Sequence, residues 1–105
     1  MRFLVVSQQK QPFPPEAALG LVDAMMGWIS KYTANGKLEQ IWAFPGENGG
    51  GSIVNVDSPE ELRDIMMENP FTPFVENEIH PLVDVNDTMQ RLKQAIQAMA
   101  PGGGR

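Results

Sequence analysis

The spacing of apolar and polar residues changes several times along the chain, and each change predicts a new element. Residues 2–8 (RFLVVSQ) are rich in β-branched and aromatic side chains, which predicts a first strand. Apolar residues then recur every three or four positions, which predicts an amphipathic helix that Pro15 and Glu16 open and Asn35-Gly36 ends. The predicted inner face of this helix comprises Ala18, Leu21, Val22, Met25, Trp28, Ile29 and Tyr32.

The middle of the chain has the pattern of a hairpin. Residues 37–44 (KLEQIWAF) alternate in polarity, which predicts a second strand with two distinct faces. Residues 45–51 (PGENGGG) are typical of a turn, and residues 52–56 (SIVNV) predict a third strand, so the two strands are expected to pair through a glycine-rich loop. The predicted faces of the second strand are Leu38, Gln40, Trp42 and Phe44 on one side and Glu39, Ile41 and Ala43 on the other.

A second helix, a fourth strand and a third helix follow. Ser58 and Glu61 form a capping box around Pro59, which predicts a helix over residues 59–68 with Leu62, Ile65 and Met66 inward. Residues 75–83 predict a strand, and Asn86 or Asp87 is expected to cap a last helix with a narrow apolar stripe: Met89, Leu92, Ile96 and Met99. Residues 101–105 (PGGGR) are expected to be a flexible tail.

This order predicts an α+β fold of the ferredoxin-like type. It is a βαββαβ antiparallel sheet with two helices on one face and an added C-terminal helix, in a single domain of residues 1–100. The first strand is apolar at every position from Phe3 to Val6, as if both faces of the sheet were covered. The natural cover for the second face is the sheet of another copy, which predicts a homodimer or a higher homo-oligomer.

Composition narrows the range of functions. The 105 residues include no Cys and one His, which excludes a thiolate nucleophile, a cysteine metal site and a multi-histidine metal site. The net charge is −5 and the basic residues are scattered, so neither nucleic acid nor an anionic membrane surface is an expected partner. The apolar runs are too short for a membrane span or a secretory signal, so the expected address is the cytoplasm.

His80 and Glu78 are the candidate proton-transfer pair. His80 is the only side chain whose ordinary pKa lies near neutrality, and alternation places it on the same strand face as Glu78, about 6.5 to 7 Å away along the backbone. The two groups could flank one small molecule. The competing interpretation is that His80 ends an edge strand and that Glu78 discourages pairing with another edge.

Aromatic side chains supply a candidate binding surface for a small apolar ring. Trp42, Phe44, Phe71 and Phe74 could line a pocket for a flat molecule, with the hydroxyl of Tyr32 at its edge; for each of them a place in the core is the competing interpretation. The glycine run 46–51 has neither the lysine nor the following helix of a phosphate loop, so a hairpin turn explains it.

Several of these segments together resemble the muconolactone delta-isomerase family. The resemblance covers residues 36–83 and rests on GKLEQIW, the glycine turn, SIVNVDSPEELRDIM and NPFTPFVENEIHPL. Its marked positions are Trp42, Ser58, Glu61, Leu62, Pro70, Pro73, Phe74, Glu76, Glu78 and Leu82. The resemblance implies a dimeric α+β barrel and an isomerase without cofactor that shifts a double bond by moving a proton within a small unsaturated lactone.

The chain departs from the family pattern at two basic positions, which are Ala43 and Glu47 here. A substrate carboxylate would need a cation, so the resemblance supports the fold more strongly than the reaction. Two alternatives therefore stay open beside the isomerase. One is a cofactor-independent monooxygenase on the same barrel, and the other is a binding or assembly module without catalysis.

Overall fold

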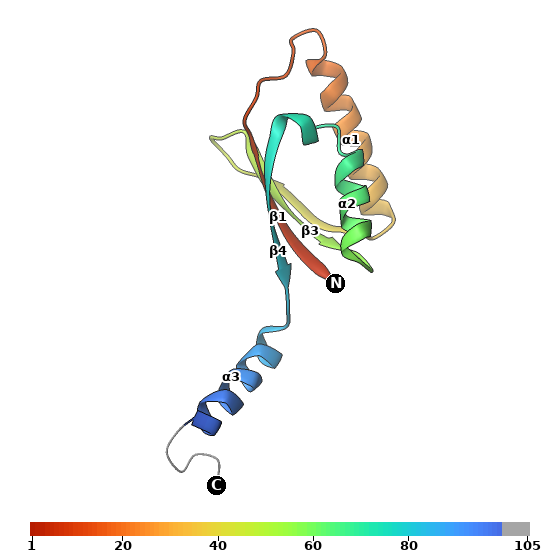
Figure 1. Ribbon diagram of the computed structural model, residues 1–105. Helices are drawn as coiled ribbons and strands as arrows, with labels where there is room; N and C mark the ends of the chain where they lie inside the picture. The colour runs from red at the N-terminus through yellow and green to blue at the C-terminus, as the bar shows by residue number, and fades with distance from the viewer. Residues whose placement is uncertain (100–105) are drawn as a thin grey trace.

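The computed structural model describes residues 1–99, and its sheet and first two helices form one compact layered body (Figure 1). The elements in chain order are β1 (Arg2–Gln9), α1 (Ala18–Ala34), β2 (Leu38–Ala43), β3 (Gly49–Asn55), α2 (Pro59–Glu68), β4 (Val75–Leu82) and α3 (Val85–Met99). A short 3-10 helix, Thr72–Phe74, leads into β4. The sequence did not predict this turn. The expected tail, residues 101–105, lies outside the described residues.

The strands form one antiparallel sheet in the order β2-β3-β1-β4. Helices α1 and α2 cover one face, and no helix within residues 1–99 lies over the other (Figure 1). This is the ferredoxin-like α+β arrangement that the sequence predicted. The first strand lies between β3 and β4, with Phe3 and Val5 buried under the helices and Leu4 and Val6 only partly buried on the open face.

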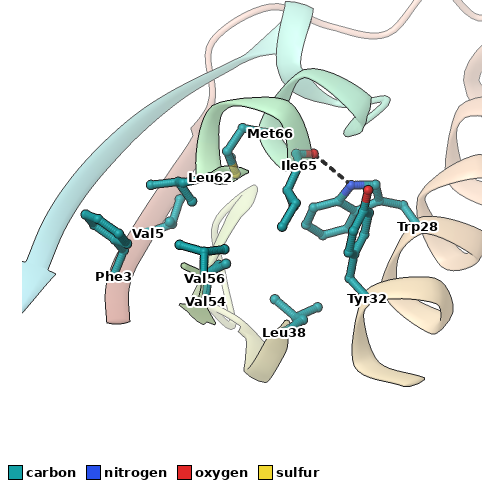
Figure 2. Packing of buried hydrophobic residues seen from close by; sticks show 10 residues of the cluster. All are labelled: Phe3, Val5, Trp28, Tyr32, Leu38, Val54, Val56, Leu62, Ile65 and Met66. Carbon is teal, nitrogen blue, oxygen red and sulfur yellow. Dashed lines mark hydrogen bonds between the residues drawn. The ribbon is translucent and has the colours of Figure 1, made fainter. Parts of the chain in front are cut away.

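The core lies between the helices and the covered face of the sheet. Buried side chains come from every element that meets there, and Figure 2 shows how they converge: Phe3, Val5, Trp28, Tyr32, Leu38, Val54, Val56, Leu62, Ile65 and Met66. The indole Nε1 of Trp28 donates a hydrogen bond of 3.1 Å to the carbonyl oxygen of Ile65, joining α1 to α2 (Figure 2). Trp28 thus contributes both apolar area and a satisfied polar group to the core.

Helix α2 has the predicted bounds, and α1 begins slightly later than predicted. The hydroxyl of Ser58 accepts a hydrogen bond from the backbone N–H of Glu61, and the three predicted inward residues of α2 are buried. Pro15 and Glu16 lie in a turn before α1, whose first residue is Ala18 and whose N-cap, Ala17, makes no side-chain bond. Gly36, with a φ of 79°, ends α1 as expected.

The predicted faces of β2 were wrong for Leu38, while Gln40 with Trp42 and Ile41 with Ala43 share faces as predicted. A register shift between Leu38 and Gln40 inserts an extra residue, so that Leu38 pairs with Val54 and Ile41 pairs with Ser52. Simple alternation had placed Leu38 and Ile41 on opposite faces, but the bulge turns both toward the helices. Trp42 pairs with Gly51 and takes the opposite face from Ile41.

The predicted loop of the hairpin was too long. Gly49–Gly51 belong to β3 and pair with β1, because their lack of side chains lets neighbouring groups approach closely. A Cβ atom on Gly50 would lie 2.3 Å from the carbonyl oxygen of Trp42. A Cβ atom on Gly51 would lie 2.6 Å from the Trp42 ring. These glycines are therefore needed for packing inside a strand.

Helix α3 extends away from the body (Figure 1). Its cap is Asp84, not the predicted Asn86 or Asp87, because the carboxylate of Asp84 accepts a 2.9 Å hydrogen bond from the backbone N–H of Asp87. The predicted apolar stripe is on the helix, but half or more of each of its side chains is exposed: Met89, Leu92, Ile96 and Met99.

Candidate active site

A cavity of about 510 Å³ lies between the covered face of the sheet and the helices. Strands β1, β2 and β3 form its floor, α1 contributes one wall, and the segments before α1 and after α2 close its end. The lining residues are Val5, Ser7, Gln9, Phe13, Met25, Trp28, Ile29, Ile41, Trp42, Ala43, Asn48, Gly49, Gly50, Gly51, Ser52, Met66, Asn69, Phe71 and Val75. This volume lies within the usual range for a site that encloses a small organic molecule.

Aromatic rings form one end of the cavity. Phe13 and Phe71 line it with their ring centroids 4.8 Å apart, and Phe74 packs edge-on against Phe13 from behind, at 5.0 Å and 86°. Phe71 thus lines the cavity, where a ring-binding surface was predicted, whereas Trp42 borders the cavity from β2 with its ring on the opposite face, against Gly51. Phe74 supports this wall through Phe13 and is not among the lining residues.

The other two aromatic candidates lie elsewhere. Tyr32 is buried in the core, where its hydroxyl donates a hydrogen bond to the carboxylate of Glu68. This bond, together with burial, raises the pKa of Tyr32, while the same bond and the nearby Lys31 lower the pKa of Glu68. Phe44 follows β2, and its backbone N–H donates to the carbonyl oxygen of Gly49 in the hairpin. Neither residue is among those that line the cavity.

The structure brings Glu78 and His80 together, but on the opposite face of the sheet from the cavity. Nε2 of His80 lies 2.9 Å from Oε1 of Glu78, and both side chains are at least half exposed. In the strand register Glu78 pairs with Val6 and His80 pairs with Leu4, which alternate with the buried Phe3 and Val5. The pair therefore belongs to the face that the helices leave open.

The open face has its own row of side chains. Trp42, Gly51, Val6 and Glu78 follow one another across the four strands. Trp42 and Glu78 are therefore about 14 Å apart, because adjacent strands are separated by about 4.8 Å. A shallow hollow next to β4 lies beside this row and is lined by Val6, Gln8, Lys10, Glu76, Asn77 and Glu78. The predicted acid–base pair thus borders solvent at the edge of the sheet.

Only Trp42 and Phe71 among the lining residues were predicted for the site, and three of the others come from loops: Phe13, Asn48 and Asn69. All three lie outside the periodic segments, so hydrophobic spacing carries no information about them. Asn69 could have been noticed as a polar residue between a helix end and Pro70. Its carboxamide oxygen accepts a 2.8 Å hydrogen bond from the backbone N–H of Phe71, which fixes the chain at the cavity wall.

Within residues 1–99, no group of three or more His, Asp or Glu side chains is placed to hold a metal ion. In that same range, none of the helices has both the length and the apolar character that crossing a membrane requires.

Comparisons with known proteins agree on one family. The family model for muconolactone delta-isomerase matches residues 1–99. A muconolactone delta-isomerase from Rhodococcus opacus is 38% identical over 48 residues, which is 46% of this chain. That match spans 52%, about half, of the length of the curated relative.

Solved structures give the same result for the fold. The crystal structure of a muconolactone isomerase superposes with a TM-score of 0.74 at 26% identity, covering 80% of this chain and 90% of that one. A 5-chloro-2-hydroxyhydroquinone dehydrochlorinase from Burkholderia phenoliruptrix, in complex with 2,5-dihydroxybenzoquinone, has a TM-score of 0.61 at 15% identity. It covers 83% of this chain and 98% of its own, and shares the fold. Because the family model matches nearly the whole chain, the protein belongs to the muconolactone delta-isomerase family.

Proposed function

We propose that this chain is an isomerase without cofactor that shifts a double bond in a small unsaturated lactone or a related ring compound. Membership of the muconolactone delta-isomerase family supports the reaction class. The observation that carries the proposal for this chain is the cavity of about 510 Å³ between the sheet and the helices. In this proposal the ring lies in that cavity, because enclosure fixes its orientation. The proton that leaves one ring carbon passes to solvent and another returns from solvent to the second carbon, because no lining side chain is an acid or a base.

The lining suits a flat and mostly apolar ring. Phe13 and Phe71 offer aromatic surface at one end, and Ile29 and Ile41 offer aliphatic surface between sheet and helix. A few neutral polar side chains are available to orient ring oxygens, among them Asn69. Apolar walls with a small number of polar groups are typical of sites for small molecules.

Proton transfer by Glu78 and His80 stays a prediction. Their contact at 2.9 Å brings together a carboxylate and an imidazole, two groups that serve as general acids and bases in enzymes. Their side chains leave the sheet on the open face, so this role requires the reacting ring to lie against Val6 and not in the cavity. Variants in the cavity lining and at Glu78 can therefore distinguish a ring bound in the cavity from a ring bound on the open face.

We also propose that the protein forms a homodimer through the open face of the sheet, giving a dimeric α+β barrel. Leu4, Val6 and Ile53 are apolar, occupy this face and are only partly buried in the single chain. Packing against a second sheet would remove them from water. Such packing would also enclose the hollow beside Glu78.

The experiment is an isomerisation assay by proton NMR in deuterated water, with muconolactone and no added cofactor. Wild type is expected to shift the double bond and incorporate deuterium from the solvent. Ala43→Phe places a large ring at the cavity lining from an exposed position and is expected to lower kcat/KM by at least about tenfold. Ala24→Phe makes the same change on an exposed part of α1 away from the cavity and serves as the control.

The same assay with Glu78→Gln tests the acid–base prediction. Loss of turnover in Glu78→Gln, with normal turnover in Ala43→Phe, would move the reacting ring to the open face. Absence of turnover by wild type, for muconolactone and for its methyl ester alike, would contradict the proposed function.

A further inference from the structure

The side chains that line the cavity are all neutral. Most are apolar or glycine, and the polar ones are hydroxyls and carboxamides: Ser7, Gln9, Asn48, Ser52 and Asn69. Such groups can donate to or accept from a ring oxygen. They cannot balance a full charge on a ligand that has lost its water.

Within residues 1–99, no Lys or Arg lines the cavity. Of the eight Lys and Arg residues, six form ion pairs with carboxylates at 2.6 to 4.0 Å. The seventh, Lys93, lies on α3, and Arg105 lies outside the described residues. The positions at the cavity nearest to the hairpin, Ala43 and Asn48, are both uncharged. A carboxylate buried in this cavity would therefore lose its hydration without gaining a cation from residues 1–99 of the same chain.

Asn69 is the polar group best placed to recognise a ligand. It is 8% exposed, at the junction of α2 and the aromatic wall. Its Oδ1 accepts the backbone N–H of Phe71, which orients the amide. This bond occupies the acceptor end of the side chain and leaves the Nδ2 amino group as the donor for a ligand oxygen.

Resting on the proposed function, we infer that the cavity selects a ring compound without a free carboxylate, whose carbonyl oxygen accepts a hydrogen bond from Nδ2 of Asn69. The substrate class is thus a neutral unsaturated lactone, such as one whose side chain ends in an ester or an alkyl group. Muconolactone itself carries a carboxylate and is the poorer ligand.

The test compares binding of muconolactone and its methyl ester by isothermal titration calorimetry at about pH 7. Wild type is expected to bind the ester at least about tenfold more tightly, because the ester needs no counter-charge. Ala43→Lys adds a cation at an exposed lining position and is expected to shift this preference toward the acid by about tenfold. Ala43→Met has a similar length without the charge and is expected to keep the preference for the ester.

A second pair of variants tests the donor. Asn69→Asp keeps an acceptor for the Phe71 N–H but removes the amino group, and it is expected to weaken ester binding by about tenfold. Asn35→Asp makes the same chemical change after α1, at a residue whose Oδ1 also accepts the backbone N–H two positions on and which is outside the set of lining residues, and it is expected to bind the ester as wild type does. The melting temperature of each variant, measured without ligand, shows that it is folded.

The possible failures can be told apart. Equal or tighter binding of the acid by wild type, with turnover of the acid, would overturn this inference and leave the proposed function standing. Unchanged ester binding in Asn69→Asp would overturn the role of Asn69. If wild type neither binds nor converts either compound, the inference fails together with the proposed function.

Discussion

At the scale of residues, the buried Tyr32 connects the surface carboxylate of Glu68 to the core through a hydrogen bond. The Tyr32 ring packs against Trp28 at a centroid distance of 5.4 Å, while its hydroxyl reaches the carboxylate of Glu68 on α2. Lys31 adds an ion pair of 3.1 Å to the same carboxylate. Because the hydroxyl bond favours the ionised carboxylate, it lowers the pKa of Glu68.

This contact predicts a pH dependence of stability. Since the pKa of Glu68 is lower in the folded than in the unfolded state, its contribution is present above the unfolded pKa and is lost as the pH falls through the folded one. Tyr32→Phe removes the bond that causes the shift, so the variant should lose less unfolding free energy than wild type between about pH 7 and about pH 3. Urea denaturation at several pH values measures this, and parallel curves would contradict it.

Replacing the buried Trp28 by a smaller aromatic residue is expected to lower the stability of the fold. Trp28→Phe shortens a 7% exposed ring and leaves the carbonyl of Ile65 without its donor, which should lower the free energy of unfolding by about 2 kcal/mol. Trp42→Phe is the matched comparison, because Trp42 is 38% exposed and should lose less than half as much. Urea denaturation at neutral pH gives both values. Equal losses would mean that burial at position 28 is not what stabilises the core.

At the scale of elements, the β2–β3 hairpin depends on glycines that a sequence pattern assigns to a loop. Gly50 and Gly51 lie inside β3, opposite Ala43 and Trp42, and each leaves space that a neighbouring group fills. The bulge in β2 and these glycines together turn Ile41 toward the cavity and bring the backbone of the hairpin to its rim. The shape of the candidate site is therefore a property of the pairing of these two strands.

Alanine substitutions at two glycines test this interpretation. Gly50→Ala places a Cβ atom 2.3 Å from the backbone oxygen of Trp42, so the strands must separate and the free energy of unfolding should fall by at least about 2 kcal/mol. Gly20→Ala, in α1, meets nothing within 4 Å and should raise it by about 0.5 to 1 kcal/mol through helix propensity. Thermal or urea unfolding of both variants provides the measurement. A neutral Gly50→Ala would show that the close approach does not constrain the hairpin.

Regular periodicity predicted the elements well, and irregular geometry limited the prediction of the site. The capping box at Ser58 and the spacing of Leu62, Ile65 and Met66 defined α2, because both signals act within a single helix. The face of Leu38 in β2 was assigned wrongly because a bulge shifts the alternation of side chains, and the hydrophobic pattern of the sequence does not reveal a bulge. Phe13 and Asn69 were missed because tertiary contacts alone bring these loop residues to the cavity.

At the scale of the whole molecule, one apolar face and one amphipathic helix have no partner within the described chain. The open face of the sheet presents Leu4, Val6 and Ile53. Helix α3 projects from the body (Figure 1), and the side chains of its apolar stripe are exposed. Exposed apolar surfaces of this kind are typical of association. The proposed homodimer would cover this face of the sheet, from which Glu78 and His80 project.

If the protein dimerises through the open face, a single charge added to that face is expected to prevent association. Sedimentation analysis of wild type should give at least twice the chain mass of 11.6 kDa. Val6→Lys should give a monomer, because the new cation would be buried against a second sheet, while Glu78 beside it can pair with the charge in the single chain. Met26→Lys, on an exposed part of α1, should keep the wild-type mass. A wild-type monomer, or an oligomeric Val6→Lys variant, would contradict the proposed interface.

The central claim is that the cavity between the sheet and the helices holds the reacting ring. A crystal structure of the protein soaked with the methyl ester of muconolactone tests it most directly. Ligand density is expected between Ile41 and Phe71, with the ring carbonyl within hydrogen-bonding distance of Nδ2 of Asn69. Density only on the open face, over Val6 and beside Glu78, with an empty cavity, would contradict it.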